Sequence, residues 1–275
     1  MTATEGSSGV THPQLLPSRE GARGLLSVSG LVRSFGGVRA LQGVDFDVRA
    51  GTITALIGPN GAGKTTAFQC ISGVVRPEGG TVRLEGRDIT GWRPDRITQA
   101  GLVRTFQLAR GLGRMSVLDN LMLYAARQPG EGLVAAALGR GRAREAEALE
   151  QAWAVARRLN LGAVANNPAA ALSGGQKKLL ELGRALMARP RLVLLDEPIA
   201  GVNPSLAEEI AEQLRRLRDE GMTFLVIEHH MDLIARLCDP VIVMAEGRRL
   251  MEGSFAEVAG HKAVQEAYMG KRRCN

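Results

Sequence analysis

Residues 58–65 of the chain read Gly58-Pro59-Asn60-Gly61-Ala62-Gly63-Lys64-Thr65. It matches the pattern G-x-x-x-x-G-K-[ST], which is typical of a phosphate-binding loop between a strand and a helix. Residues 52–57 before it form a β-rich run, and residues 64–71 after it have a helical pattern that stops at Gly73. The loop therefore has the strand before it and the helix after it that the pattern requires.

The residue types in this loop suit a bound nucleotide. Glycines let backbone N–H groups converge on a phosphate, and the following helix offers its positive N-terminus. Lys64 supplies a point charge for the β- and γ-phosphates, and the Thr65 hydroxyl is a ligand for Mg²⁺. The predicted nucleotide contacts in this loop are Gly58, Asn60, Gly61, Gly63, Lys64, Thr65 and Thr66.

Two acidic residues follow an apolar run further along the chain. Leu192-Val193-Leu194-Leu195 reads as a buried strand, and Asp196 and Glu197 stand at its end. Such acids often only cap the next helix, but together with a phosphate loop they predict chemistry. We expect Asp196 to hold Mg²⁺ and Glu197 to polarise an attacking water.

A second glycine turn, Leu172-Ser173-Gly174-Gly175-Gln176, precedes another predicted helix. It is a second anion-binding helix start, although Ser173 alone would also read as a helix cap. One nucleotide does not need two phosphate cradles so far apart in sequence. We therefore expect this turn to serve a nucleotide held by another subunit. The residues predicted to make that contact are Ser173, Gly175 and Gln176.

Composition places the chain among globular proteins. Its 275 residues are 45% hydrophobic and 23% charged, which excludes collagen-like, mucin-like and wholly disordered proteins. No run reaches the roughly 18 to 20 apolar residues of a membrane-spanning helix. Residues 1–25 are predicted to be a flexible leader rather than a secretory signal. Three widely spaced cysteines argue against a disulfide framework or a zinc site and favour the cytoplasm.

The net charge of +7 has two interpretations. The basic residues are mostly arginines scattered among alanine and glycine, which favours a solvated surface. The alternative is a surface that binds nucleic acid. Its affinity for nucleic acid would then fall steeply as the salt concentration rises. We expect no nucleic-acid partner.

The order of predicted elements favours an α/β fold. Antiparallel strand patterns over 26–48 come first, and a strand-helix-strand crossover over 192–227 predicts a parallel sheet. Between them, residues 108–172 read as helical. The apolar face of their second helix is predicted to hold Leu149, Trp153 and Leu159, after a connection at 139–144.

These motifs together resemble the nucleotide-binding subunit of ATP-binding cassette (ABC) transporters, in which 172–176 is the signature sequence. The resemblance implies a P-loop NTPase fold with a parallel-sheet core, an N-terminal antiparallel β subdomain and an inserted helical subdomain. It spans 26–270, with the helical subdomain at about 108–176 and a tail at 271–275. ATP and Mg²⁺ are the cofactors that it implies.

The resemblance also implies roles for residues outside these motifs. Gln107 resembles the glutamine that reaches Mg²⁺ and the attacking water. His229 resembles the switch histidine that contacts the γ-phosphate and orients Glu197, with its neighbour His230 as the competing candidate. Phe35 resembles the aromatic residue that stacks on adenine, although a core position would also suit it.

The partners that the resemblance implies are a second ATP-binding subunit, integral membrane permease subunits and, indirectly, an external substrate-binding protein. The chain would then hydrolyse ATP at the cytoplasmic face of the cell membrane, and closure of the dimer would move the permease. We expect a groove that accepts a short permease helix. The apolar residues predicted to line it are Leu108, Leu112, Met115, Val117 and Leu118.

Within the family, the chain most resembles the ATPase of branched-chain amino-acid importers. The motifs that carry this resemblance include Arg104-Thr105-Phe106-Gln107 and Glu266-Ala267-Tyr268-Met269-Gly270. Importers of urea or short amides share much of the pattern, so the cargo stays open, as does the choice between homodimer and heterodimer. The alternative from another class is a soluble cassette ATPase acting on ribosomes or DNA.

Overall fold

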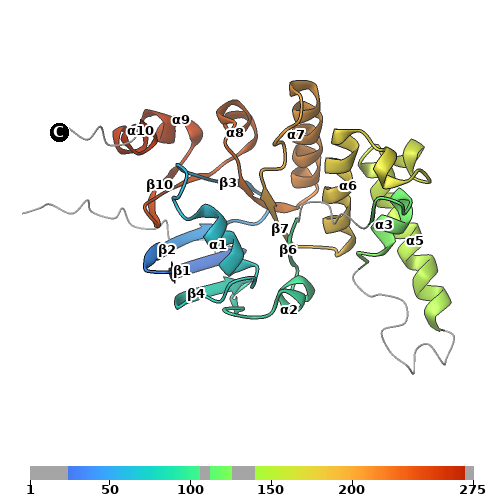
Figure 1. Cartoon of the computed structure of the whole chain (residues 1–275), viewed down its shortest axis with the longest axis horizontal. Helices are drawn as coiled ribbons and strands as arrows, with labels where there is room; N and C mark the ends of the chain where they lie inside the picture. The colour runs from blue at the N-terminus through green and yellow to red at the C-terminus, as the bar shows by residue number, and fades with distance from the viewer. Residues whose placement is uncertain (1–23, 106–111, 126–139, 270–275) are drawn as a thin grey trace, which may run out of the picture.

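The computed structural model describes residues 24–105, 112–125 and 140–269 (Figure 1). It begins with an antiparallel sheet in the order β2-β1-β4-β5, as the sequence predicts. The predicted leader at 1–25 lies almost wholly outside the described residues. The strands of this sheet are β1 (Leu26–Phe35), β2 (Val38–Val48), β4 (Gly79–Leu84) and β5 (Arg87–Asp88).

A six-stranded sheet forms the centre of the molecule, in the order β10-β9-β3-β8-β7-β6. All neighbouring strands in it are parallel except β10, which runs antiparallel to β9, so the predicted parallel core is confirmed. Its strands are β3 (Ile53–Ile57), β6 (Leu102–Arg104), β7 (Leu192–Asp196), β8 (Thr223–Ile227), β9 (Val241–Ala245) and β10 (Arg248–Gly253).

The register of this sheet brings the sequence motifs together. Strand β8 lies between β3 and β7, and its last residue, Ile227, pairs with Leu56 of β3 and with Asp196 of β7. The carboxyl ends of these three parallel strands therefore meet at one edge of the sheet. The phosphate loop, the acidic pair and the segment of His229 each follow one of these strands.

The core sheet is buried on both faces, which explains why its strands are almost wholly apolar. Alternate residues point to opposite faces, and each face has its own hydrophobic cluster. One face packs against the N-terminal sheet and against α1 (Lys64–Ile71) and α2 (Pro94–Gln99). The other packs against α6 (Gly174–Met187), α7 (Pro204–Asp219) and α8 (Met231–Leu237).

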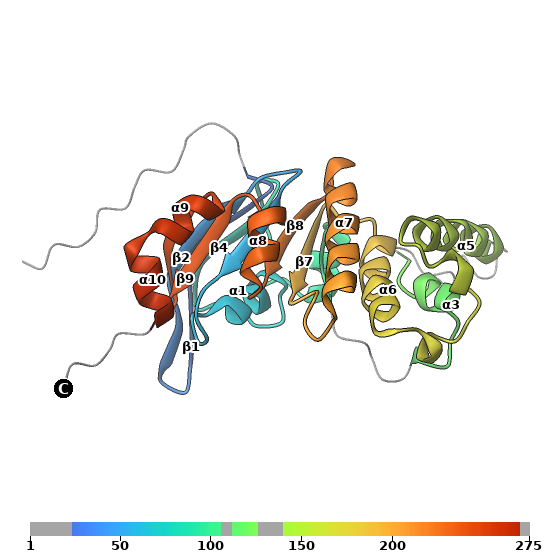
Figure 2. The same ribbon diagram turned by 90° about the horizontal axis from the view of Figure 1, so that it is seen from above.

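A helical part extends from α6 at one end of the molecule, as Figures 1 and 2 show. It contains α3 (Val117–Met122) and α5 (Arg140–Arg158), and the short turns Gly162–Val164 and Ala169–Ala171 lead back to α6. At the opposite end, α9 (Phe255–Gly260) and α10 (Lys262–Met269) follow β10. No helix among the described residues is long and apolar enough to cross a membrane.

One sequence prediction about α5 is wrong, and another holds only in part. Residues 140–144 belong to the helix and do not form a connection, because arginine and alanine are good helix formers that offset the single Gly141. The predicted buried face is confirmed only in part, since Leu159 is fully buried, Trp153 is half-buried against the core and Leu149 is exposed. The face is narrower and richer in alanine than the leucine positions suggested. The residues that pack inward are Ala148, Ala152, Val155, Ala156 and Leu159.

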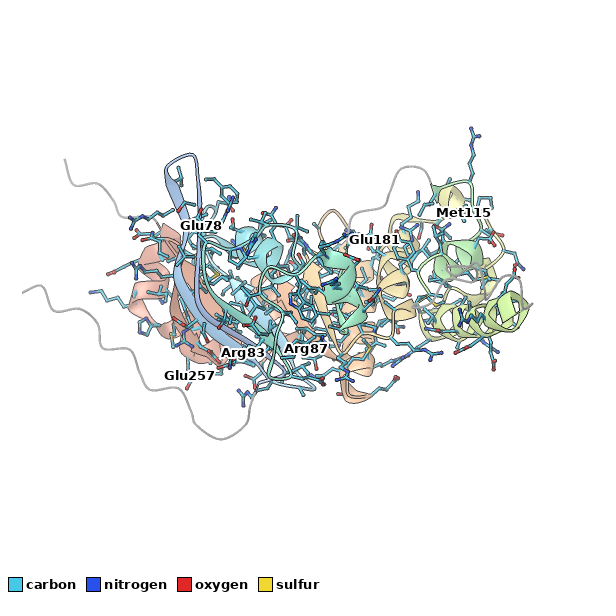
Figure 3. The ribbon with its side chains drawn as sticks, turned by 90° about the horizontal axis from the view of Figure 1, so that it is seen from below. Glu78, Arg83, Arg87, Met115, Glu181 and Glu257 are labelled. Atoms are coloured by element: carbon cyan, nitrogen blue, oxygen red, sulfur yellow. The ribbon has the colours of Figure 1, made fainter. Side chains whose placement is uncertain are left out.

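Two of the residues predicted to line a groove for a permease helix are buried in the core instead. Val117 and Leu118 are buried in the core of the helical part, where they pack with α5 and α6. Leu112 and Met115 are half-buried, and Leu108 lies outside the described residues. Figure 3 shows Met115 at the end formed by the helical part, away from Glu78 and Arg83 beside the N-terminal sheet.

Candidate functional site

The phosphate loop connects β3 to α1, and its backbone needs glycine at two positions. Gly58 has a φ of 150°, and a Cβ atom there would lie 2.1 Å from the carbonyl oxygen of Met244. Gly63 has a φ of 97°, and a Cβ atom there would lie 2.4 Å from the carbonyl oxygen of Ala40. The loop is thus packed tightly against β2 and β9, while Asn60, Gly61 and Thr65 remain exposed.

Lys64 is held within this loop. Its side chain is buried, and Nζ donates hydrogen bonds to the carbonyl oxygens of Gly58 at 2.7 Å and Pro59 at 3.1 Å. Burial lowers the pKa of Lys64, and the charges of Glu197 and Asp196 act in the opposite direction. The lysine is therefore close to both acidic residues at the end of β7.

Asp196 forms an ion pair that the sequence analysis missed. The Nη2 atom of Arg104, at the end of β6, lies 2.7 Å from Oδ2 of Asp196, and both side chains are largely buried. The guanidinium group of Arg104 also lies over the ring of Phe68 in α1. The parallel pairing of β6 with β7 places Arg104 near Asp196, and a search for motifs alone carries no such signal.

Glu197 adopts a left-handed backbone conformation, with a φ of 50°. A non-glycine residue is strained there, so neighbouring contacts must hold it. The Glu197 N–H donates to the carbonyl oxygen of Ile227 at 2.9 Å, and its own carbonyl oxygen accepts from the Ala200 N–H at 3.1 Å. This turn directs the carboxylate toward the segment that follows β8, where Oε1 lies 2.8 Å from Nε2 of His229.

The two neighbouring histidines have different partners. His229 contacts Glu197, whereas Nδ1 of His230 lies 3.2 Å from Oε2 of Glu228. Glu228 is only 2% exposed and did not feature in the sequence analysis as a site residue. Of the two histidines, His229 is thus the one beside the predicted base.

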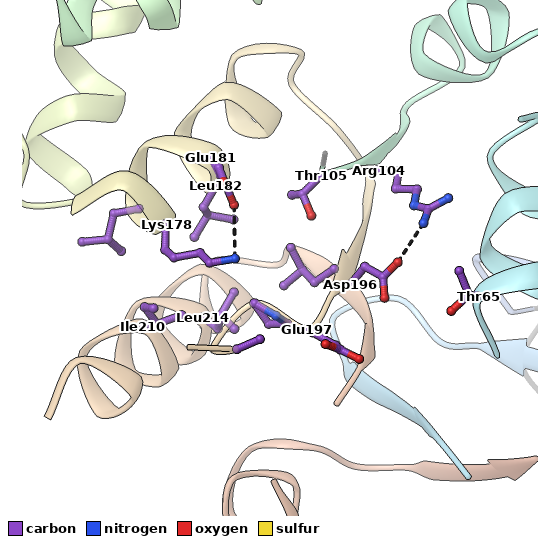
Figure 4. A pocket seen from close by; sticks show the side chains of 14 residues that line it. Thr65, Arg104, Thr105, Lys178, Glu181, Leu182, Asp196, Glu197, Ile210 and Leu214 are labelled. Atoms are coloured by element: carbon purple, nitrogen blue, oxygen red, sulfur yellow. Dashed lines mark hydrogen bonds and ion pairs between the residues drawn. The ribbon is translucent and has the colours of Figure 1, made fainter. Parts of the chain in front are cut away.

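A cavity of about 500 Å³ joins several of these residues (Figure 4). Thr65 lies on one side of it and the Lys178–Glu181 ion pair of α6 on the other, with Asp196 and Glu197 between them. The structure therefore brings together Lys64, Thr65, Asp196, Glu197 and His229. Gln107, which the sequence also assigns to this group, lies outside the described residues.

The second glycine turn lies elsewhere in the molecule. Ser173 is the N-cap of α6, and its Oγ accepts from the Gln176 N–H at 3.2 Å, while Gln176 Oε1 accepts from the Ser173 N–H at 3.0 Å. Ser173 is exposed, whereas Gly175 is buried against α7. Strand β7 lies between α1 and α6 in both Figure 1 and Figure 2, so this turn and the phosphate loop are apart within one chain.

Two aromatic residues bear on the proposed nucleotide site in different ways. Phe35 ends β1 and is 42% exposed, and the guanidinium carbon of Arg33 lies 4.7 Å from its ring centre. Tyr268 of α10 lies near the backbone of Gly58, a proximity that the sequence analysis missed. The burial of its hydroxyl raises the pKa of Tyr268. The C-terminal helix thereby lies near the first glycine of the loop.

Comparisons with known proteins agree with this geometry. The family model "ABC transporter" matches residues 41–200. A probable branched-chain amino acid transport ATP-binding protein, LivG of Archaeoglobus fulgidus, is 40% identical over 90% of this chain and 95% of its own length. The high-affinity branched-chain amino acid transport ATP-binding protein BraF of Pseudomonas aeruginosa is 38% identical over 91% of this chain and 99% of its own.

Solved structures of ABC transporter proteins also resemble this chain. The crystal structure of a nucleotide-free ATP-binding cassette from an ABC transporter is 36% identical, with a TM-score of 0.79 over 90% of this chain and 99% of its own. CbiO1 of Clostridium perfringens, part of the transporter complex CbiONQ, is 28% identical, with a TM-score of 0.75 over 88% of this chain and 93% of its own. The chain therefore belongs to the ABC transporter family, as the ATP-binding subunit that hydrolyses ATP.

Proposed function

We propose that this chain hydrolyses ATP to drive the import of branched-chain amino acids. The cargo is supported by the likeness to LivG and BraF over 90% and 91% of the chain. The observation that carries the hydrolytic mechanism is the 2.8 Å contact between Oε1 of Glu197 and Nε2 of His229, close to Lys64. A carboxylate held by a histidine beside a phosphate loop suits the activation of a water molecule.

In this proposal the phosphate loop binds the ATP phosphates. Lys64 exchanges its contacts with the carbonyl oxygens of Gly58 and Pro59 for contacts with phosphate oxygens, since its ammonium group prefers the charged partner. Glu197 takes a proton from the attacking water, and His229 holds the carboxylate in position. Phe35 stacks on the adenine. The other proposed phosphate contacts are Gly58, Asn60, Gly61, Gly63, Thr65 and Thr66.

The donor set also suits Mg²⁺. The Thr65 hydroxyl and the Asp196 carboxylate line one cavity, and Mg²⁺ prefers hard oxygen ligands of these kinds. Thr65, Asp196 and Gln107 are the proposed ligands. When bound, the metal would neutralise the negative charge of the phosphates.

We further propose that two chains complete each ATP site. The exposed Ser173 turn of one subunit would face the phosphate loop of the other, with Ser173, Gly175 and Gln176 contacting the second subunit's nucleotide. The polarity of the turn and its position at the start of α6 suit an anion. A second ATP-binding subunit, membrane permease subunits and an external substrate-binding protein are the proposed partners. The subunit would then work at the cytoplasmic face of the membrane.

Mixed dimers test this arrangement. Lys64→Ala removes one half of a site and Ser173→Arg blocks the other, so each variant alone is expected to lose ATP turnover. A mixture can still assemble one intact site from two good halves, and part of the turnover should return. If crosslinking demonstrates mixed dimers and no turnover returns, assembly of the site from two chains is contradicted.

Transport measurements test the cargo. Co-expression with its permease subunits should bring the chain into the membrane fraction and increase its ATP turnover. Labelled leucine, isoleucine or valine should then enter the cells, and unlabelled urea should not compete. Import of urea or an amide without import of leucine would overturn the cargo while leaving the ATPase intact.

A further inference from the structure

Glu228 is a buried carboxylate with both oxygens occupied. It follows the last residue of β8 and is 2% exposed. Its Oε1 accepts a hydrogen bond from the N–H of Ile199 at 3.2 Å, and its Oε2 accepts one from the N–H of His229 at 3.0 Å. A buried carboxylate is costly unless such donors surround it, so this position needs a specific explanation.

The two backbone donors belong to the two segments that carry the catalytic pair. Ile199 lies two residues after Glu197, and His229 is the partner of Glu197 itself. The turn at Glu197 is otherwise joined to β8 through the hydrogen bond between its N–H and the carbonyl oxygen of Ile227. The hydrogen bond from the Ile199 N–H to Glu228 joins the same turn to the end of β8 a second time, two residues further along the chain.

The surroundings of Glu228 fit a carboxylate better than an amide. Both protein N–H groups donate to it, and a carboxylate accepts at both oxygens. The imidazole of His230 lies 3.2 Å from Oε2. The thiol of Cys238 is near enough for the charge of Glu228 to help raise its pKa. An amide nitrogen at either oxygen position would face an N–H group and lose that hydrogen bond.

We propose that Glu228 is a positioning residue that fixes the turn of Glu197 against the segment of His229. The proposal rests on the proposed function, in which Glu197 and His229 act together on the attacking water. Glu228 touches neither nucleotide nor water in this account. It acts by holding two backbone segments at the separation that gives the 2.8 Å contact between Glu197 and His229.

The direct test is Glu228→Gln, which keeps the shape of the side chain and removes one acceptor. We expect kcat for ATP hydrolysis to fall about 10- to 100-fold, because misplaced catalytic groups lose this much rate. The KM for ATP should change less than about twofold, since the phosphate loop is untouched. The matched control is Asp232→Asn, an exposed carboxylate in the first turn of α8, for which both constants should stay unchanged.

A double-mutant cycle separates positioning from a general structural role. If Glu228 acts through the pair, Glu228→Gln should add less than about threefold to the loss caused by His229→Ala. Amide hydrogen exchange should become faster in peptides covering 197–202 and 228–230 and stay unchanged elsewhere. Additive losses in kcat, or faster exchange over the whole domain, would overturn the proposal.

Two further outcomes keep the proposals distinct. If Glu228→Gln does not fold, Glu228→Asp keeps the charge but shortens the reach, and the same split between kcat and KM is expected with a smaller loss. If Glu197→Gln and His229→Ala lose turnover while Glu228→Gln stays within twofold of the parent, the positioning role alone is overturned. If Glu197→Gln or His229→Ala keeps full turnover, the proposed function is overturned as well.

Discussion

Gly175 of α6 lies against Leu206 of α7 so closely that a Cβ atom at position 175 would be 2.1 Å from Cδ1 of that leucine. The second glycine of the signature turn therefore has a packing role within its own subunit. Leu206 is held near the start of α7, where Asn203 is the N-cap and accepts from the Leu206 N–H at 2.9 Å. The start of α6 and the start of α7 are thereby fixed to each other.

Gly175→Ala should destabilise the protein by roughly 1 to 3 kcal/mol, which is the usual cost of overpacking. Gly174→Ala is the matched control, because a Cβ atom there meets nothing within 4 Å. It should be neutral, or stabilising by up to about 1 kcal/mol, since alanine favours the helix. Urea unfolding measures the free energy of unfolding of each variant. An equal decrease in the two variants would contradict the packing role of Gly175. In the double variant Gly175→Ala/Leu206→Ala, the loss in free energy of unfolding should be smaller than the sum of the two single losses.

Asn120→Ala should destabilise the helical part by roughly 2 to 4 kcal/mol, because buried polar groups would lose their partners. Asn120 is fully buried and donates to the carbonyl oxygens of Leu112, Met115 and Ser116 at 3.0, 3.2 and 2.8 Å. It also accepts a hydrogen bond from Arg184 of α6. Urea unfolding measures the loss.

The control for this change is Asn166→Ala. Asn166 is exposed, and its replacement is expected to change the free energy of unfolding by less than about 0.5 kcal/mol. A loss of similar size in both variants would mean that the buried amide contributes nothing special.

The buried thiols should be unreactive in the folded protein. Burial raises the pKa of Cys70 to about 11 and that of Cys238 to about 12. At pH 8 roughly one thiol in a thousand or fewer would then be ionised. In a Cys274→Ser variant, a thiol reagent should react slowly with the native protein and quickly with two thiols in denaturant. Rapid reaction of either thiol in the native state would contradict the burial.

The same shifts fix the sign of a pH effect on stability. The unfolded thiols ionise near 9.0, whereas the folded ones hold their protons to about 11 and 12. The unfolded state therefore releases protons first, and the stability present below pH 9 should fall as the pH rises toward 12. Replacing both cysteines by alanine should flatten this part of the curve of unfolding free energy against pH.

His229→Ala should lower kcat far more than His230→Ala does, by about 10²-fold, because only His229 contacts Glu197. Both variants should keep their affinity for a fluorescent ATP analogue. Phosphate release measured at saturating ATP gives the comparison. Equal losses, or a larger loss for His230→Ala, would mean that the wrong histidine has been paired with the base.

The motif residues were predictable because the chemistry of phosphate binding fixes both their types and their spacing. The strand patterns also sufficed for the parallel core, since strands buried on both faces read as continuous apolar runs. The alanine face of α5 was not predictable from leucine positions, because small residues carry a weak periodic signal.

Contacts between distant segments were also out of reach of the sequence. Arg104 meets Asp196 only because β6 pairs with β7, and Tyr268 lies near Gly58 only because α10 follows β10 back to the loop. The sequence assigned no role to Glu228. Its burial and its two backbone donors come from how β8 and the turn at Glu197 pack together.

Steady-state phosphate release by Glu197→Gln tests whether Glu197 is the base that activates the attacking water. The amide keeps the shape and loses the base, so turnover should fall at least about 10²-fold while ATP still binds and holds a stable dimer in gel filtration. Glu209→Gln, an exposed carboxylate on α7, should match the parent and serves as the control. Turnover by Glu197→Gln within twofold of the parent would contradict the assignment of Glu197 as the base.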